Sequence, residues 1–194
     1  MKKAILTLLI VAALGMATFY VAVKNDLHKS IFGESKITDY IESLRSGYIP
    51  LTPGLVGKTA PDFTLPSATG GVIKLSDYDG QLTLINFWAP WCPPCLAEIP
   101  GFMKIQEEYR DKGLSIIGIA LEDKKAVKRY INDVKLNYST AYGSEDVHAI
   151  AGTYGNPSGA LPYSILIGKD RKILAIFMGF LSETKLKELI ENHL

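Results

Sequence analysis

The sequence is poor in the residues from which most catalytic centres are built. Its three histidines, His28, His148 and His193, are too scattered for metal-ligand spacing. It contains no Gly-rich phosphate loop, no flavin or nicotinamide motif, no Ser-His-Asp pattern and no evident carboxylate pair. We therefore expect no metal ion and no bound cofactor.

Neither sign of charge dominates the chain. The 194 residues hold 21 Lys and Arg and 20 Asp and Glu, interspersed, for a formal net charge of +1. Nucleic-acid-binding domains usually carry a strongly basic surface, so we expect no nucleic-acid partner. The chain is 47% hydrophobic, which is enough for the core of one domain with additional segments.

Cysteine is scarce as well, but its two copies stand together in the run 87–95, FWAPWCPPC, as Cys92 and Cys95. In an exported protein a pair of cysteines usually indicates a structural disulfide. A bridge across two intervening residues closes a very small loop, however, and constrains little of the unfolded chain. A C-x-x-C pair beside a βαβ pattern therefore favours a redox-active disulfide.

The flanking sequence places this pair at the start of a helix. Residues 81–87, QLTLINF, have the composition of a buried strand, and residues 96–112 have helical spacing. A helix N-terminus lowers the pKa of a thiol. We therefore expect Cys92 to be the exposed attacking thiolate and Cys95 to resolve the mixed disulfide. Pro93 and Pro94 are tolerated in the first helical turn and withdraw two N–H donors from the Cys92 sulfur.

Three further positions are candidates for the site, each with an ordinary structural alternative. Trp91 either shields one side of Cys92 or packs in the core. Glu98, one helical turn past Cys95, is either an exposed helix acid or a partly buried proton acceptor for Cys95. Pro162, preceded by Leu161, comes just before a strand, where proline on its own indicates only a strand edge.

The N-terminus predicts a membrane segment. Lys2 and Lys3 precede residues 4–23, which carry no charge; about 20 apolar residues span a bilayer as a helix. The lysines place the N-terminus in the cytoplasm and the rest of the chain outside it. A signal peptide cleaved after residues 15–17, GMA, is the alternative. We expect an uncleaved anchor over residues 1–23, followed by a connector over residues 24–57.

Residues 58–194 are expected to form one α/β domain. The order is a hairpin around residues 69–71, a strand, the cysteine-bearing helix, a strand at 114–121, two helices, strands at 163–167 and 173–180, and a final helix. Asp123 and Ser182 are predicted N-caps of the second and last helices. Parallel strands with helical crossovers followed by an antiparallel hairpin predict a mixed sheet covered on both faces.

The same residues resemble the thioredoxin superfamily, and more closely the membrane-tethered TlpA/ResA-like thiol-disulfide oxidoreductases of bacteria. The resemblance is carried by residues 60–63 (APDF), residues 86–95 (NFWAPWCPPC), Glu98 followed by Pro100, and residues 161–167 (LPYSILI). It implies a thioredoxin fold with an added N-terminal β-hairpin. It also implies a cis peptide bond at Leu161-Pro162, where the backbone pairs with a substrate, and a role for Glu98 near the cysteines.

The sequence departs from related patterns in three places. Asn86 stands where thioredoxins proper carry a buried aspartate, which leaves Glu98 as the available acid. Residues 154–162, YGNPSGALP, lack the acid of the G-V-x-G-x-P-E stretch common in cytochrome-c-maturation members. The opening APDF is shared with peroxiredoxins, but the chain lacks their P-x-x-x-T-x-x-C setting.

The function expected from these features is reduction of protein disulfides outside the cytoplasm. Because the chain has no second dithiol, its electrons must come from another protein, for which a membrane thiol carrier is the expected donor. The expected location is the cell inner membrane, with the domain on the periplasmic side. The alternatives are an oxidase that introduces disulfides, since the reduction potential sets the direction, and a non-catalytic peptide-binding or chaperone module.

Overall fold

The computed structural model describes residues 54–194. Within this range no helix is both long and apolar enough to cross a membrane. The predicted anchor over residues 1–23 and nearly all of the predicted connector lie outside the described residues. The predicted boundary of the folded domain, near residue 58, falls just inside them.

A five-stranded mixed sheet forms the centre of the domain, in the order β5-β4-β3-β6-β7. The parallel part consists of β3 (Leu82–Trp88), β4 (Leu114–Leu121) and β5 (Ser139–Gly143). The antiparallel part consists of β6 (Tyr163–Ile167), which pairs with β3, and β7 (Ile173–Met178), which pairs with β6. All seven residues of β3 are buried, as expected of a central strand covered on both faces.

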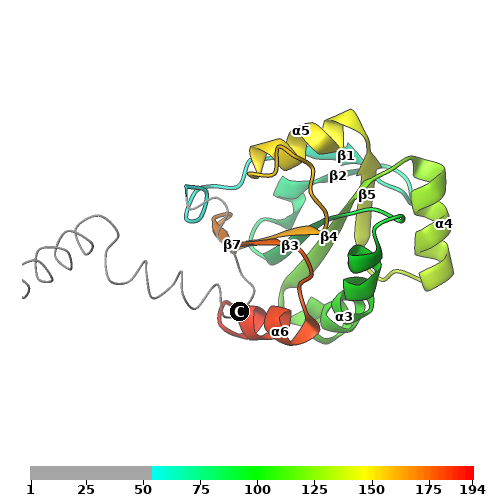
Figure 1. Ribbon diagram of the computed structural model, residues 1–194. Coiled ribbons are helices and arrows are strands. Elements are labelled where there is room, and N and C mark those ends of the chain that lie inside the picture. The colour runs from blue at the N-terminus through cyan, green and yellow to red at the C-terminus, as the bar shows by residue number, and fades with distance from the viewer. Residues whose placement is uncertain (1–53) are drawn as a thin grey trace, which may run out of the picture. The chain divides into compact units, whose positions relative to one another are not determined.

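Helices cover both faces of this sheet (Figure 1). On one face lie α3 (Pro93–Tyr109), α4 (Lys124–Val134) and α6 (Glu183–Glu191), whose buried side chains pack against the alternate residues Leu82, Leu84 and Trp88 of β3. On the other face lie α5 (Glu145–Thr153) and the N-terminal hairpin. The predicted mixed sheet with two covered faces is confirmed.

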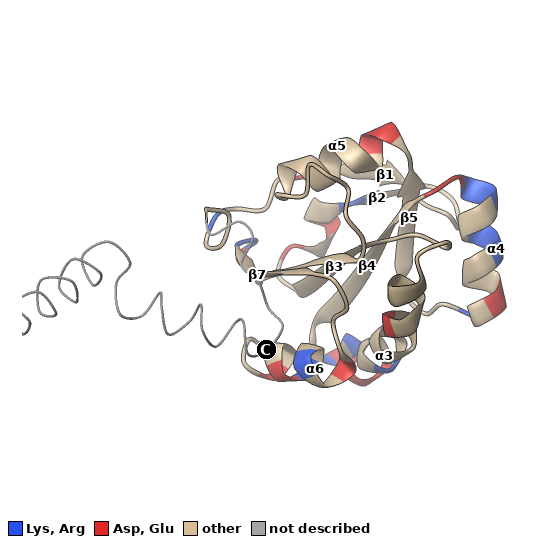
Figure 2. Cartoon of the chain, viewed as in Figure 1, with Lys and Arg blue, Asp and Glu red and all other residues tan. Residues whose placement is uncertain are grey.

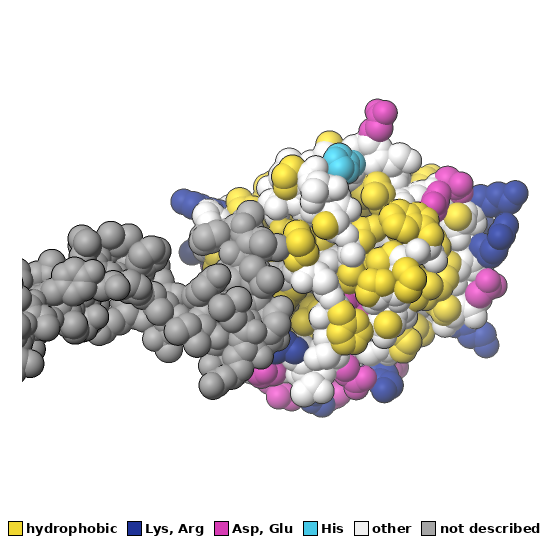
Figure 3. Space-filling view, in the orientation of Figure 1, with side chains coloured by type: hydrophobic (Ala, Val, Ile, Leu, Met, Phe, Trp, Pro, Cys, Tyr) yellow, Lys and Arg dark blue, Asp and Glu magenta, His cyan; other side chains and the backbone are white. Residues whose placement is uncertain are grey.

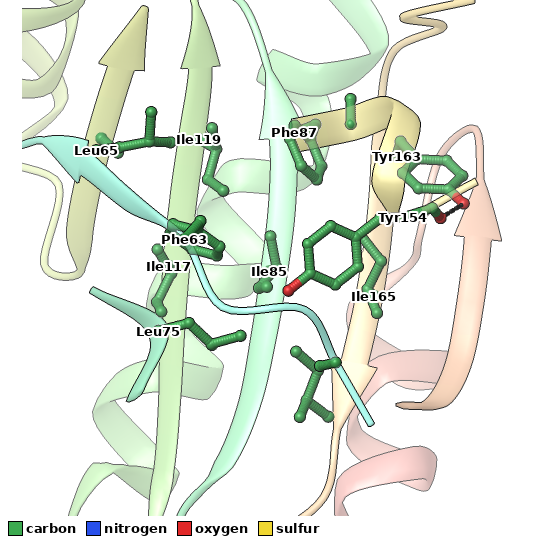
Figure 4. Packing of buried hydrophobic residues seen from close by; sticks show 14 of the residues in the cluster. Phe63, Leu65, Leu75, Ile85, Phe87, Ile117, Ile119, Tyr154, Tyr163 and Ile165 are labelled. Atoms are coloured by element: carbon green, nitrogen blue, oxygen red, sulfur yellow. Dashed lines mark hydrogen bonds between the residues drawn. The ribbon is translucent and has the colours of Figure 1, made fainter. Parts of the chain in front are cut away.

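The N-terminal hairpin, β1 (Thr64–Pro66) and β2 (Val72–Lys74), is followed by the 3₁₀ helix η1 (Leu75–Tyr78). Phe63, Leu65 and Leu75 point into the apolar layer formed by Ile85 and Phe87 of β3, Ile117 and Ile119 of β4, and Tyr154 and Tyr163 (Figure 4). The hairpin is therefore part of the core, and it joins the main sheet through a bridge between Ser67 and Ala141.

One strand was not expected from the sequence. Residues 139–143, STAYG, form the edge strand β5, whereas the sequence predicts two consecutive helices between β4 and β6. The segment has no apolar run, and only Thr140 and Ala141 are buried. It is a strand because its neighbours pair with it: β4 on one side, and the backbone of Ser67 and Ala68 on the other.

Candidate active site

The two cysteines form a disulfide between the end of β3 and the first turn of α3, with their Cα atoms 5.3 Å apart. Cys92 is the N-cap of α3, and Pro93 and Pro94 occupy the following positions. The predicted junction of buried strand and helix is therefore confirmed. A thiolate released at Cys92 would lie at the positive end of the helix dipole.

Both cysteines are buried in the disulfide form, whereas the predicted exposure of Cys92 concerns the reduced thiol and stays a prediction. Cys92 is 4% exposed and Cys95 is fully buried. The cause is the apolar cluster that encloses both residues, to which Trp88 and Ile99 also contribute. Cys92 remains the more accessible of the two, as its position at the N-cap requires.

Glu98 is buried in the same helix. It is only 2% exposed, so the exposed-acid alternative is wrong. The reason is its position in the stripe of α3 that faces the sheet, together with Cys95, Ile99 and Phe102. Its carboxylate accepts two hydrogen bonds, from Asn86 Nδ2 to Oε1 at 2.7 Å and from the Leu181 backbone N–H to Oε2 at 3.0 Å.

Burial raises the pKa of Glu98 from about 4.5 to about 7. Removing the carboxylate from water disfavours its charged form, and this effect outweighs the two hydrogen bonds from Leu181 and Asn86, which favour that form. A carboxyl group with a pKa near neutrality can both accept and release a proton under ordinary conditions. Glu98 lies one turn past Cys95 on the same face of α3.

Asn86 connects Glu98 to the neighbouring strand. It is a polar residue at the centre of the fully buried strand β3, and such a residue needs partners. Its Nδ2 donates to Glu98 and also to Ser164 Oγ at 3.0 Å, while its Oδ1 accepts no hydrogen bond within the described residues. The sequence indicated only that Asn86 replaces an aspartate; its pairing with Glu98 comes from the structure.

The Leu161-Pro162 peptide bond is cis, as the resemblance implied. Leu161 packs against the apolar cluster that contains the cysteines. The Pro162 carbonyl accepts a hydrogen bond from the Gly179 N–H at 2.8 Å, and two residues later the Leu181 N–H reaches Glu98. The segment 179–181 therefore joins the proline turn to the buried acid, a connection that sequence reasoning missed because a backbone N–H leaves no sequence signal.

Two aromatic side chains are exposed next to these groups. Trp91, adjacent to Cys92, is 61% exposed, and Phe180, between Gly179 and Leu181, is 56% exposed. The core-packing alternative is thus wrong for Trp91, whereas it holds for Trp88, which is fully buried and stacks at a tilt on Tyr130. Phe180 is a further candidate that the sequence did not reveal.

A disulfide at the N-terminus of a helix, following the central strand of a mixed sheet, defines a dithiol oxidoreductase of the thioredoxin class. The solved thioredoxin domain of a thiol-disulfide oxidoreductase from Bacteroides vulgatus is similar, with a TM-score of 0.62 and 26% identity over 71% of this chain and 96% of that one. A secreted thiol-disulfide isomerase from Corynebacterium glutamicum also has a TM-score of 0.62, with 25% identity over 66% and 81% of the two chains. The predicted thioredoxin fold is confirmed.

The sequence comparisons name the family. Residues 56–176 match the AhpC/TSA family. The chain is 36% identical over 140 residues to the thiol-disulfide oxidoreductase ResA of Bacillus thuringiensis (strain Al Hakam), which spans 72% of this chain and 76% of that protein. The ResA of Geobacillus kaustophilus (strain HTA426) is 34% identical over 140 residues, which again span 72% of this chain and 76% of that protein. The chain belongs to the ResA-like thiol-disulfide oxidoreductases of the AhpC/TSA family, and it is an enzyme of that kind.

Proposed function

We propose that the enzyme works as a reductase of protein disulfides outside the cytoplasm. The observation that carries the proposal is a carboxyl group, that of Glu98, buried one turn past Cys95. Reduction of a substrate ends with attack by Cys95, and that attack requires Cys95 to lose its proton. A carboxyl group with a pKa of about 7 is suited to take it.

The reaction passes two electrons to the substrate. The Cys92 thiolate attacks one sulfur of the substrate disulfide, and the other substrate sulfur leaves as a thiolate. Cys95 then transfers its proton to Glu98 and attacks the Cys92 sulfur, so that the second substrate sulfur leaves. The products are a reduced substrate and the Cys92–Cys95 disulfide. The proposed substrate contacts are the exposed Trp91 and the partly exposed Leu161 with the buried Pro162 that follows it.

The oxidised enzyme must then be reduced by another protein. The sequence contains no cysteine beyond Cys92 and Cys95, so a thiol carrier in the membrane is the proposed donor. Residues 4–23 are the proposed single-pass anchor in the cell inner membrane, with the domain on the periplasmic side. The secreted isomerase from Corynebacterium glutamicum, which has a similar fold, supports an extracytoplasmic location.

The reduction potential of the Cys92–Cys95 couple tests the direction of electron flow. It can be measured by equilibrating the full chain with defined dithiol buffers and following the disulfide by alkylation. We expect a value nearer that of thioredoxin, about −270 mV, than that of the oxidase DsbA, about −120 mV. A value near the latter would identify a disulfide-introducing oxidase, and no reduction of insulin with a small dithiol donor would favour a non-catalytic binding module.

A further inference from the structure

Helix α4 has one face in the active-site core and the other in solvent. Its buried residues Val127 and Ile131 belong to the same apolar cluster as Cys92 and Cys95. The outer face of α4 lies about one helix diameter, or roughly 10 Å, from the side of the helix that packs in this cluster. Whatever docks at the disulfide also comes close to this outer face.

The outer face carries four cations that have no ion-pair partner within residues 54–194. Lys124, Lys125, Lys128 and Arg129 are all exposed, and none forms a salt bridge. Elsewhere in this range six of the eleven cations pair with a carboxylate, namely Lys104, Arg110, Arg171, Lys172, Lys185 and Lys187. We call the four side chains on α4 the cationic face of α4; Figure 2 colours the Lys and Arg positions of this helix blue on the ribbon.

This arrangement costs the helix stability. Lys124 and Lys125 stand at its N-terminus, where cations oppose the helix dipole, and no acid occupies the first turn. The pairs Lys124–Lys128 and Lys125–Arg129 are like charges four residues apart, which repel one another and destabilise the helix. The acids that precede the helix form no ion pair with these cations: Asp123 caps the Ala126 N–H, and the Glu122 carboxylate accepts from the Asp123 N–H. Asp133 lies one turn past Arg129 on the same helix but forms no ion pair with it.

The cationic face borders an exposed apolar area. Figure 3 shows apolar side chains gathered on the face turned to the viewer, with basic side chains along the edge formed by α4. Among the exposed residues beside the disulfide are Trp91, Pro93, Pro94 and Phe180. An apolar centre with a charged rim is typical of a protein-binding surface.

The chemistry of α4 indicates what kind of partner its cations meet. A helix that binds a membrane surface needs an apolar face free for the lipid, and the apolar face of α4 is already in the core. Resting on the proposed reductase function, we propose that the cationic face of α4 docks an acidic segment of the substrate polypeptide while its disulfide reaches Cys92. The enzyme would thereby prefer disulfides with acidic residues nearby.

Two peptides test this proposal on the full chain in detergent. Both contain the same disulfide ring flanked by apolar residues, and they differ only in a tail of four Glu or four Lys. We expect kcat/KM for the acidic peptide to exceed that for the basic one by about 10-fold or more at low salt, and the difference to shrink at about 1 M salt, where screening extends over only about 3 Å.

The variant Lys125→Glu/Arg129→Glu should abolish or invert this preference. A matched control is Lys58→Glu/Lys74→Glu, which changes the same charge at two exposed lysines outside α4 and should keep the preference. The wild type and both variants should reduce a small neutral disulfide at the same rate. This measurement separates the docking proposal from the proposed function, because failure of all three proteins to reduce that disulfide would contradict the reductase activity itself.

Equal rates on the two peptides, or a preference that survives in the α4 variant, would overturn the proposal. A lipid partner would also overturn it. That outcome would appear as no peptide preference, together with protection of Lys125 from amine-modifying reagents after reconstitution into vesicles containing phosphatidylserine but not into neutral phosphatidylcholine vesicles.

Discussion

At the scale of single residues, the buried Glu98 makes the stability of the protein depend on pH between about 4.5 and 7. Its pKa is about 7 in the folded protein and about 4.5 when exposed to water, so between these values the folded state binds one proton that the unfolded state has released. Stability therefore falls as pH rises through this window and levels off above it. The shift corresponds to about 3 kcal/mol of unfolding free energy.

The variant Glu98→Gln should remove this pH dependence. Glutamine is neutral like the protonated acid, so the variant and wild type should be about equally stable at pH 5, and the variant should be more stable at pH 8 by up to about 3 kcal/mol. Asn86 can accommodate the new amide because its Oδ1 has no other partner in the described domain. Urea denaturation of both oxidised proteins from pH 5 to 8 measures the difference; parallel curves would contradict the buried, titrating carboxyl.

The same variant should slow the second half of the reaction. Without the carboxylate, Cys95 must lose its proton to water, and turnover should fall by about 10²-fold if Glu98 is the only general base. Single-turnover kinetics should show a longer-lived mixed disulfide with an unchanged rate of first attack. Unchanged turnover between pH 6 and 8 would mean that Glu98 is only structural.

The roles of the two cysteines give a third prediction. The N-cap position makes Cys92 the thiol with the lower pKa, and Cys95 is fully buried. Cys95→Ser should therefore accumulate mixed disulfides with substrates, whereas Cys92→Ser should accumulate few or none. Alkylation of the reduced protein as a function of pH should find Cys92 reacting below the ordinary thiol pKa of about 8.5; earlier reaction of Cys95 would reverse the assignment.

At the scale of elements, the sequence predicts what local pattern determines. The apolar runs of β3 and β4 were found, and so were the N-caps Asp123 and Ser182, whose side chains accept hydrogen bonds from Ala126 N and Lys185 N. The strand β5 was missed because its pairing partners, not its composition, decide its conformation. The burial of Glu98 could have been predicted from the helical spacing, because Glu98 lies on the same face of the helix as the apolar residues Cys95, Ile99 and Phe102.

A row of neighbouring residues crosses the sheet beneath α3: Asn86 of β3, Gly118 of β4 and Thr140 of β5. A Cβ at Gly118 would lie 3.0 Å from Trp88 Nε1 and 3.2 Å from Thr140 Oγ1. Gly118→Ala should therefore lower the unfolding free energy by about 1–3 kcal/mol through overpacking.

The matched control for this change is Gly152→Ala. Gly152 lies within α5, and a Cβ there would meet only Pro157 Cα at 3.9 Å. Alanine in a helix should stabilise the protein by about 0.5–1 kcal/mol. Urea denaturation measures both variants, and a stabilising Gly118→Ala would show that the row has room beside Trp88.

At the scale of the whole molecule, the prediction concerns residues 4–23. The charge-free segment after Lys2 and Lys3 should keep the protein in the membrane fraction with its C-terminus outside the cytoplasm. Cell fractionation combined with protease access to a C-terminal tag measures both properties. A soluble form that begins near Thr18 would establish a cleaved signal peptide instead.

Four hydrogen bonds and two short stretches of the chain together form a closed circuit around Glu98. From Glu98 the circuit runs through Asn86 to Ser164 of β6, back along the chain to Pro162, across to Gly179, and through the Leu181 N–H to Glu98 again. The proline turn and the proton acceptor therefore share one frame, although they lie more than 60 residues apart in sequence. The bonds from Asn86 and Leu181 keep the pKa of Glu98 below the value that burial alone would give, so a substrate that displaced the turn and strained them would make the site less acidic.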